Sequence, residues 1–256
     1  MEHQLVTLAE RPDLEAQTWA INSESWPAFM LEDPVANRLW NRLFTDFQPF
    51  QILLIDEGEQ VLGFGNSIPL IWDSTVAGLP TGWDAVLEQG MQEYDQGRAP
   101  TTLSALSITL ARGQQGKGLS NWLIRGMKAA AARAGLDAVI APVRPSLKSR
   151  YPLTPIARYL AWTQDDGSPF DPWVRTHWRL GARILRLAPE SMVIPGTLAQ
   201  WESWTGMRFP ESGVYIVPDA LEPITIDREA DLGRYVEPNV WMRHPVEPAG
   251  TMDDGR

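Results

Sequence analysis

The chain has 256 residues, 44% of them hydrophobic and 21% charged, so it can bury a core without cross-links, and it has no cysteine to form one. A net charge of −10 argues against a nucleic-acid-binding protein, which needs a basic face. No apolar run approaches ~18 residues, and the acidic N-terminus lacks the features of a signal peptide. The sequence therefore predicts a cytoplasmic protein with no membrane partner.

The N-terminal part alternates between apolar runs and segments that begin with proline. Pro12 and Pro34 stand where a first helical turn tolerates proline, and a polar turn over 57–60 separates two apolar runs typical of a β-hairpin. In chain order we expect a strand over 4–8, helices over 13–22 and 35–45, hairpin strands over 51–55 and 61–68, and an insertion near 73–100 with a short helix over 83–94.

A strand, a glycine loop and a helix follow in the centre of the chain. The strand is expected over 103–111, and the helix over 117–134, because its apolar residues recur at helical spacing. Gly135 is a suitable residue to end this helix, and 137–143 form the next strand. The centre is thus a βαβ-like unit that should build on one shared sheet.

The C-terminal part predicts a second insertion near 144–170, with a short helix over 155–162. Asp171 and Pro172 are typical of a helix start, so a helix is expected over 171–180. The remaining predictions are strands over 182–187 and 213–217, a single domain over 1–245, and a loose C-terminal tail over 246–256.

The loop Gly-Gln-Gln-Gly-Lys-Gly over 113–118 connects the central strand to the helix. Such a loop directs several backbone N–H groups to one point, and the helix N-terminus adds a partial positive charge, so the loop suits a diphosphate. It does not fit the nucleotide-triphosphate motif, because Ala111 and Gly118 occupy two of its required positions. It does not fit the dinucleotide motif either, because Asn121 replaces the third glycine.

The segment from Ser107 to Ser120 resembles the acyl-CoA-binding loop of the GNAT acetyltransferase superfamily, whose motif is Gln/Arg-x-x-Gly-x-Gly/Ala. Gly116 and Gly118 match its two small positions, whereas Gly113 stands where Gln or Arg is usual. The order of predicted elements over about 4–217 also resembles that family. The resemblance implies an α/β GNAT fold: a mixed, mostly antiparallel central sheet, splayed in the middle and flanked by helices on both faces.

The same resemblance implies acetyl-CoA as the acyl donor and a set of residues to bind it. Backbone amides at the start of the helix would hold the pyrophosphate, and the preceding strand would pair with the pantetheine arm as if that arm were another strand. The pyrophosphate residues would be Gln114, Gln115, Gly116, Lys117, Gly118, Leu119 and Ser120; the pantetheine residues would be Ser107, Ile108 and Thr109.

Acid–base chemistry could come from His177, which stands where many GNAT enzymes have a tyrosine that protonates the leaving thiolate. A histidine can give or take a proton near neutral pH, but a His177 that only hydrogen-bonds in the core, or that lies exposed on its helix, is an equal alternative. Tyr159 is a weaker candidate for the same task, as is Tyr151. The three histidines lie far apart in sequence and no carboxylates show ligand spacing, so no metal site is expected.

Polar residues elsewhere could bind the acceptor. Glu237, Asn239 and His244 cluster near the C-terminus and could line a pocket, although structural roles are favoured. Arg144 and Lys148 could bind a carboxylate or the adenosine phosphate, with a solvated surface position as the favoured alternative.

The function that follows is direct transfer of an acetyl or short acyl group from acyl-CoA to an amine on a small molecule or peptide. A non-catalytic acyl-CoA sensor on the same fold is the main alternative, because a fold does not by itself define a function. Transfer to a hydroxyl or of a longer acyl group is a third. The sequence leaves the oligomeric state open, with a homodimer among the alternatives.

Overall fold

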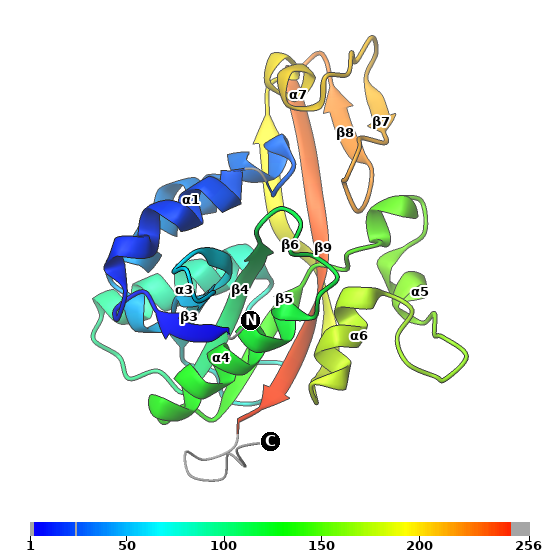
Figure 1. The fold of residues 1–256 in the computed structure, drawn as a ribbon. Coiled ribbons are helices and arrows are strands. Elements are labelled where there is room, and N and C mark those ends of the chain that lie inside the picture. The colour runs from blue at the N-terminus through cyan, green and yellow to red at the C-terminus, as the bar shows by residue number, and fades with distance from the viewer. Residues whose placement is uncertain (1–2, 24, 247–256) are drawn as a thin grey trace.

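The computed structural model describes residues 3–23 and 25–246, which form a mixed, mostly antiparallel sheet covered by helices (Figure 1). The strands lie in the order β1-β2-β3-β4-β5-β9-β8-β7, and β6 pairs with the other edge of β9. Their bounds are β1 Gln4–Thr7, β2 Ile52–Ile55, β3 Val61–Leu70, β4 Thr102–Leu110, β5 Ala138–Val143, β6 Arg183–Gly196, β7 Gly213–Tyr215, β8 Ile224–Asp227 and β9 Leu232–Pro245.

Helices cover both faces of the N-terminal half of the sheet, which is why every residue of β2 and β3 is buried. One face packs against α1 to α3 and the 3-10 helices beside them, and the other against α4. The predicted helix over 35–45 is a short α-helix that continues as a 3-10 helix over Trp40–Phe44. The α-helices are α1 Glu15–Ser23, α2 Pro34–Leu39, α3 Trp83–Asp95 and α4 Leu119–Arg133.

The sheet splays between β4 and β5, as the resemblance implied. These parallel strands pair only through Leu103 with Val139 and Ser104 with Ile140. Beyond that point β4 continues to Leu110 along β3, with an irregularity opposite Asn66 and Ser67, whereas β5 continues along β9. The two strands therefore separate towards their C-terminal ends, which leaves a gap in the pairing between β4 and β5 beyond Ser104.

The C-terminal half contains a long two-stranded arm that the sequence predicted incompletely. β6 and β9 pair along their length, and β9 runs down the centre of the molecule in Figure 1, from α7 and β8 at its upper end to β5 at its lower end. The strand expected over 182–187 extends to Gly196, and the strand expected over 213–217 is a short edge strand. β8, β9 and α7 (Leu198–Thr205) were not predicted.

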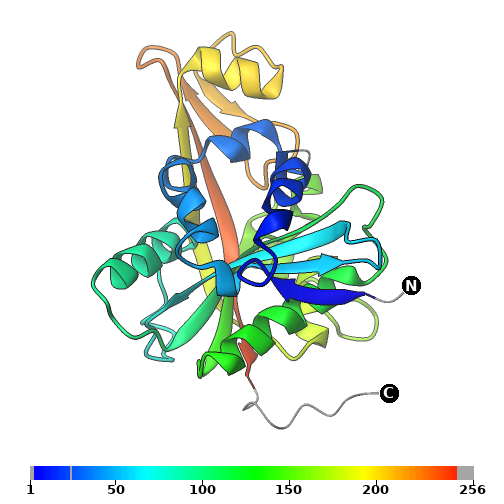
Figure 2. The same cartoon turned by 60° about the vertical axis from the view of Figure 1, so that its left-hand side comes forward.

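The two insertions contact different parts of the sheet. The insertion near 73–100 is fastened to the arm: Arg186 and Trp241 donate to carbonyls of its loop, and Asp84 accepts from the amide of Val193. The insertion near 144–170 holds α5 (Ile156–Leu160) and leads into α6 (Pro172–Arg179), which packs on β5 and β9. Figure 2 shows the N-terminal helices (blue) in front of the middle of the arm, where the 3-10 helix over Ala28–Glu32 contacts β6 and α7.

Residues 247–256, which include nearly all of the predicted loose tail, lie outside the described residues. Within the described part of the chain, no helix combines the length and apolar character needed to cross a membrane.

Candidate functional site

The glycine loop between β4 and α4 has the backbone conformation that its sequence requires. Gly113, Gly116 and Gly118 have φ values of 79°, 77° and 74°, in the left-handed region that only glycine adopts readily. Apart from the glycine itself and its neighbours in the chain, no atom of the described residues lies within 4 Å of where a Cβ would stand at Gly113 or Gly116. These glycines are therefore needed for the path of the chain and leave open space beside the loop.

The start of α4 presents its backbone amides at the end of this loop. Gly118 is the residue before the helix, and the first-turn amides have no carbonyl ahead of them within it. The Leu119 side chain is buried in the core and anchors this end, while Lys117 is exposed and donates to the Gln114 side chain at 2.9 Å. These first-turn amides and Lys117 lie where the sequence predicts the anion site, which stays a prediction.

The three strand residues expected beside the pantetheine arm lie on β4 where it has left β5. The hydroxyl of Ser107 donates to Asn66 of β3 at 3.0 Å, and Ile108 packs on the α4 side of the sheet. The hydroxyl of Thr109 is buried and has no hydrogen-bond partner among the described residues. The fold thus holds the side chains of Ser107 and Ile108 and leaves the Thr109 hydroxyl unpaired among the described residues, and pairing with an extended ligand would use the backbone of the strand.

His177 lies deep in the core between α6 and β9. Its Nδ1 is 2.8 Å from Nε2 of His244, and Trp173 packs edge-on against its ring. Burial, followed by the neighbouring His244, lowers the pKa of His177 well below its ordinary value, and burial lowers the pKa of His244 to about 4. Both rings are therefore neutral at pH 7. The structure brings together two histidines that are distant in sequence, and an acid role for His177 stays a prediction.

Tyr159 is also buried, and its hydroxyl donates to Asp171 Oδ2 at 2.7 Å. Burial and this carboxylate raise the pKa of Tyr159. Asp171 caps α6 through the amides of Trp173 and Val174, so its carboxylate joins α5 to the start of α6. Tyr151 packs against Tyr159 in the same aromatic group. The structure therefore gives Tyr159 a packing role and does not bring it into contact with His177.

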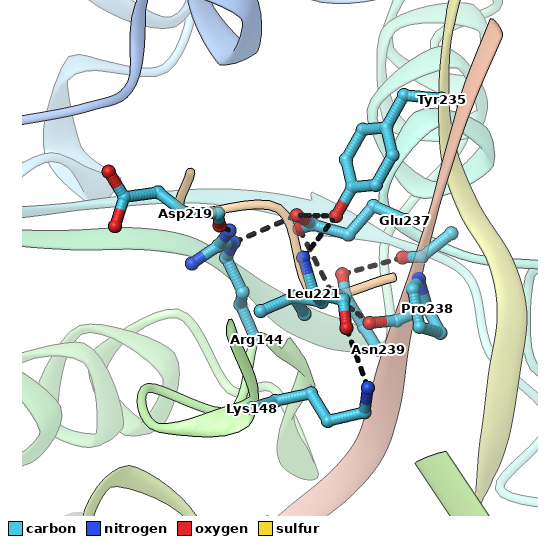
Figure 3. A network of polar contacts seen from close by, with 9 residues as sticks. Arg144, Lys148, Asp219, Leu221, Tyr235, Glu237, Pro238 and Asn239 are labelled. Atoms are coloured by element: carbon cyan, nitrogen blue, oxygen red, sulfur yellow. Dashed lines mark hydrogen bonds and ion pairs between the residues drawn. The ribbon is translucent and has the colours of Figure 1, made fainter. Parts of the chain in front are cut away.

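A network of polar side chains joins the end of β5 to β9 (Figure 3). Arg144 follows β5 directly, and its Nε donates to Glu237 Oε2 at 2.8 Å. The same carboxylate accepts from the Tyr235 hydroxyl at 3.0 Å and from Asn239 at 3.3 Å. Lys148 is wholly buried and donates to two backbone carbonyls. A solvated surface position, the favoured alternative for Lys148, was therefore wrong, because the 216–223 segment covers it.

The network continues from β9 to Leu106 of β4, which lies at the irregularity in the pairing of β4 with β3. The hydroxyl of Ser191 donates to Asn239 Oδ1 at 2.7 Å and accepts from the Trp83 amide at 2.9 Å. The indole of Trp83 donates to the carbonyl of Leu106 at 2.9 Å. Glu237 and Leu106 are thus linked through hydrogen bonds. The sequence missed this link, since Trp83 and Ser191 carry no motif.

Two carboxyl groups face each other beside this network. Asp33 caps α2 by accepting from the amide of Ala36, and it lies close to Asp84 at the start of α3. Burial raises the pKa of Asp33, and burial and the Asp33 charge raise the pKa of Asp84 to about 8. The pair therefore keeps a proton at pH 7. No group of three His, Cys, Asp or Glu residues in the described chain is arranged to hold a metal ion.

A cavity of about 410 Å³ opens beside Arg144. Three chain segments line it: the connection after α1, the segment after β5 and the segment between β7 and β8. Its lining combines the guanidinium of Arg144, the acidic Asp219, the indole of Trp26 and several hydroxyls. Both charge signs and an aromatic face therefore meet in one open cavity.

Comparisons with known proteins agree with this architecture. No model of a known protein family matches the chain. The chain is 33% identical, over 276 residues, to the arginine N-acetyltransferase avaD of Aspergillus versicolor, an alignment that covers 95% of this chain and 94% of that protein.

Two solved structures share the fold over nearly the whole chain. The loading GNATL domain of CurA from Lyngbya majuscula superposes with a TM-score of 0.58 at 16% identity, covering 96% of this chain and 98% of that domain. The GNAT-like decarboxylase GphF, solved in complex with isobutyryl-CoA, gives a TM-score of 0.56 at 16% identity, covering 96% of this chain and all of that one. At these identities the likeness shows the fold alone.

Proposed function

Because the chain belongs to the GNAT superfamily of acyl-CoA-dependent N-acetyltransferases, we propose that it transfers an acetyl group from acetyl-CoA to arginine. Transfer from acyl-CoA to an amine is the chemistry of the family, and it favours an enzyme over the non-catalytic sensor. The identity of the acceptor, arginine, is what this proposal adds to the chemistry of the family. It is supported by the name of the relative at 33% identity and by the charges that line the cavity beside Arg144.

The cavity is the observation that carries this acceptor. Arginine has a carboxylate, a guanidinium and an α-amine joined by a short aliphatic chain. The cavity offers a guanidinium at Arg144, a carboxylate at Asp219 and an indole face at Trp26, against which a cation or an aliphatic chain can pack. A purely apolar amine would make no use of the guanidinium nitrogen of Arg144 that the network leaves free or of the Asp219 carboxylate.

The donor site proposed for acetyl-CoA is the glycine loop together with the gap between β4 and β5. The first-turn amides of α4 and Lys117 supply donors for the pyrophosphate, and the part of β4 beyond Ser104 is free of β5 for the pantetheine arm. The loop lies at the start of α4, whereas the segment after α1 lines the acceptor cavity. Donor and acceptor would therefore approach the splayed strands from opposite faces of the sheet.

Direct transfer needs few groups once the two substrates are held together. The amine nitrogen attacks the thioester carbon, the C–N bond forms and the C–S bond breaks, and the proton lost by the amine balances the one gained by the leaving thiolate. The amine must be neutral when it attacks, so a base is required. His177 as the acid, or Tyr159 in its place, stays a prediction.

The test is acetylation of a panel of amines followed by mass spectrometry. With acetyl-CoA as donor, we expect arginine to gain one acetyl group faster than lysine, putrescine or glycine. Turnover of another amine at a higher kcat/KM than arginine would overturn the proposed acceptor, while leaving the family assignment intact. A parallel assay with a longer acyl-CoA and with a hydroxyl acceptor addresses the other acyl transfers that the sequence left open.

Two further expectations from the sequence remain proposals, a single domain over 1–245 and a cytoplasmic location, together with a homodimer as one of the alternatives for the oligomeric state. Size-exclusion chromatography with light scattering tests the last of these.

A further inference from the structure

Arg144 combines two properties: it is fixed by a buried carboxylate, and it lines an open cavity. Its Nε donates to Glu237 at 2.8 Å, and its Nη2 donates to the carbonyl of Asp219 at 2.7 Å. Its side chain retains 20% exposure, whereas that of Glu237 retains 1%. Figure 3 shows one guanidinium nitrogen of Arg144 pointing away from the network.

The partners of Arg144 are themselves held in place, so the guanidinium is oriented before any ligand arrives. The Glu237 carboxylate also accepts from Tyr235 and Asn239, and the Tyr235 hydroxyl accepts from the amide of Leu221 at 2.8 Å. Because these groups are buried and bonded on several sides, the Arg144 side chain loses little freedom on binding a ligand.

The charge around the network favours an anion. Lys148 adds a second positive group close by, and it donates to two backbone carbonyls, those of Leu221 and Tyr151. Among the described residues, Glu237 is the one carboxylate within ion-pair distance of either cation. The Asp219 carboxylate points away from Arg144 in Figure 3 and forms no ion pair with it.

We infer that Arg144 binds the carboxylate of the acceptor in this cavity and so selects an amino acid over the corresponding decarboxylated amine. Guanidinium and carboxylate form paired, charge-assisted hydrogen bonds, which makes arginine the suitable side chain for this task. The inference rests on the proposed function, since it assigns one end of the proposed acceptor. Arg144 would then act as a specificity residue, and Glu237 as the residue that positions it.

The hydrogen-bond path from Glu237 to Leu106 relates this cavity to the reacting centre. It passes through Asn239, Ser191 and Trp83, and it ends at the carbonyl of Leu106, just beyond the point where β4 leaves β5. An acceptor held by Arg144 therefore lies on a frame that is continuous with the strand proposed to bind the donor.

The experiment compares arginine with agmatine, which is the same molecule without its carboxylate. The wild-type enzyme should prefer arginine. Arg144→Gln should lower kcat/KM for arginine about 10- to 100-fold, mainly through KM, and leave kcat/KM for agmatine within about twofold. Arg144→Lys should recover part of the preference, because it restores the charge without the paired hydrogen bonds.

Arg144→Gln leaves Glu237 buried without its cation, so the variant could unfold for that reason alone. The double variant Arg144→Gln/Glu237→Gln removes both charges and keeps an amide that Tyr235 and Asn239 can contact. It should fold and show the same loss of preference. Arg208→Gln is the matched control, because Arg208 pairs with Glu202 on the exposed surface, with 87% of its side chain exposed.

The possible outcomes separate the two proposals. A wild-type enzyme that acetylates arginine and agmatine equally well, or a folded Arg144 variant that keeps the preference for arginine, would overturn the role of Arg144 alone. A wild-type enzyme that acetylates neither amine would overturn the proposed acceptor and this inference with it.

Discussion

Gly116 shows how one residue can determine the proposed donor site. Its φ of 77° is strained for any residue with a branched side chain. Gly116→Val should therefore move the loop, turn its amides away from a diphosphate and weaken acetyl-CoA binding at least about tenfold by calorimetry.

Gly97 supplies the matched control for Gly116. It has a φ of 64°, and no other atom lies within 4 Å of where its Cβ would stand. Gly97→Val thus introduces the same kind of strain at the end of α3, away from the loop. Unchanged acetyl-CoA affinity in a folded Gly116→Val variant would refute the assignment of the loop.

His177 is a residue whose proposed role can be separated from its packing. If it protonates the leaving thiolate, His177→Ala should lower kcat about 100-fold while the Kd for acetyl-CoA stays within twofold. His244→Ala is the control, since it removes the other half of the same buried pair. Equal losses of kcat and of Tm in the two variants would show that His177 acts only in packing.

At the scale of elements, helix α7 depends on close contact with the arm. A Cβ on Gly233 would lie 2.2 Å from Cδ1 of Trp201, which is wholly buried, and 2.9 Å from Cδ1 of Ile226. Neither side chain has room to move in a packed core. Gly233→Ala should therefore lower the free energy of unfolding by about 1–3 kcal/mol, measured by urea denaturation.

A glycine on the neighbouring edge strand tests whether close contact is the cause. At Gly213 the nearest atom to a new Cβ is 4.0 Å away, so Gly213→Ala should leave the stability nearly unchanged. Similar losses in both variants would mean that alanine is unfavourable in these strands whatever surrounds it.

The elements that could be predicted from the sequence are those with a local signal. Helix α4 has a strong helical period, and Asp171 with Pro172 defines the start of α6. β9 lacks such a signal, because both of its faces are buried and polar residues with a proline, Glu237 to Asn239, interrupt its apolar pattern. Pro238 lies opposite the irregularity in β6, where a strand tolerates a missing amide.

The proposed site also has one part with a local sequence signal and one part without it. The glycine loop is contiguous, so its motif and its resemblance to a family were visible in the sequence. The acceptor cavity combines Trp26, Arg144 and Asp219, and only the folded sheet brings these distant segments together. Arg144 and Glu237 could be named as candidates from their residue types, but their ion pair could not.

At the scale of the whole molecule, the buried pairs His177–His244 and Asp33–Asp84 should change the free energy of unfolding in opposite directions as the pH rises. The folded pKa of His244 is about 4 and that of His177 is also lowered, whereas an unfolded histidine has a pKa of about 6.5. Between these values the unfolded chain binds more protons, so stability is lost as the pH falls below about 6.5. This defines the acid limb of the stability profile.

The Asp33–Asp84 pair gives the alkaline limb. The folded pKa of Asp84 is about 8, against about 3.9 when unfolded, so the folded chain binds more protons between these values and stability falls as the pH rises through them. In the acidic part of this pH range, the gain in stability with rising pH from the two histidines outweighs the loss from the carboxyl pair. Above about pH 6.5 the contribution of the histidines declines and that of the carboxyl pair dominates, so stability should be greatest near that pH.

The free energy of unfolding should accordingly decrease by about 2 kcal/mol between pH 6.5 and 8, as measured by urea denaturation. Asp84→Asn should remove most of this decrease, because an amide can donate to Asp33 and does not titrate. Asp95→Asn is the control: Asp95 is an exposed carboxylate paired with Arg42, and this ion pair lowers its pKa, so it is already ionised throughout this range. An alkaline limb that survives in Asp84→Asn would mean that another group carries it, and that the two carboxyls do not share a proton in the folded protein.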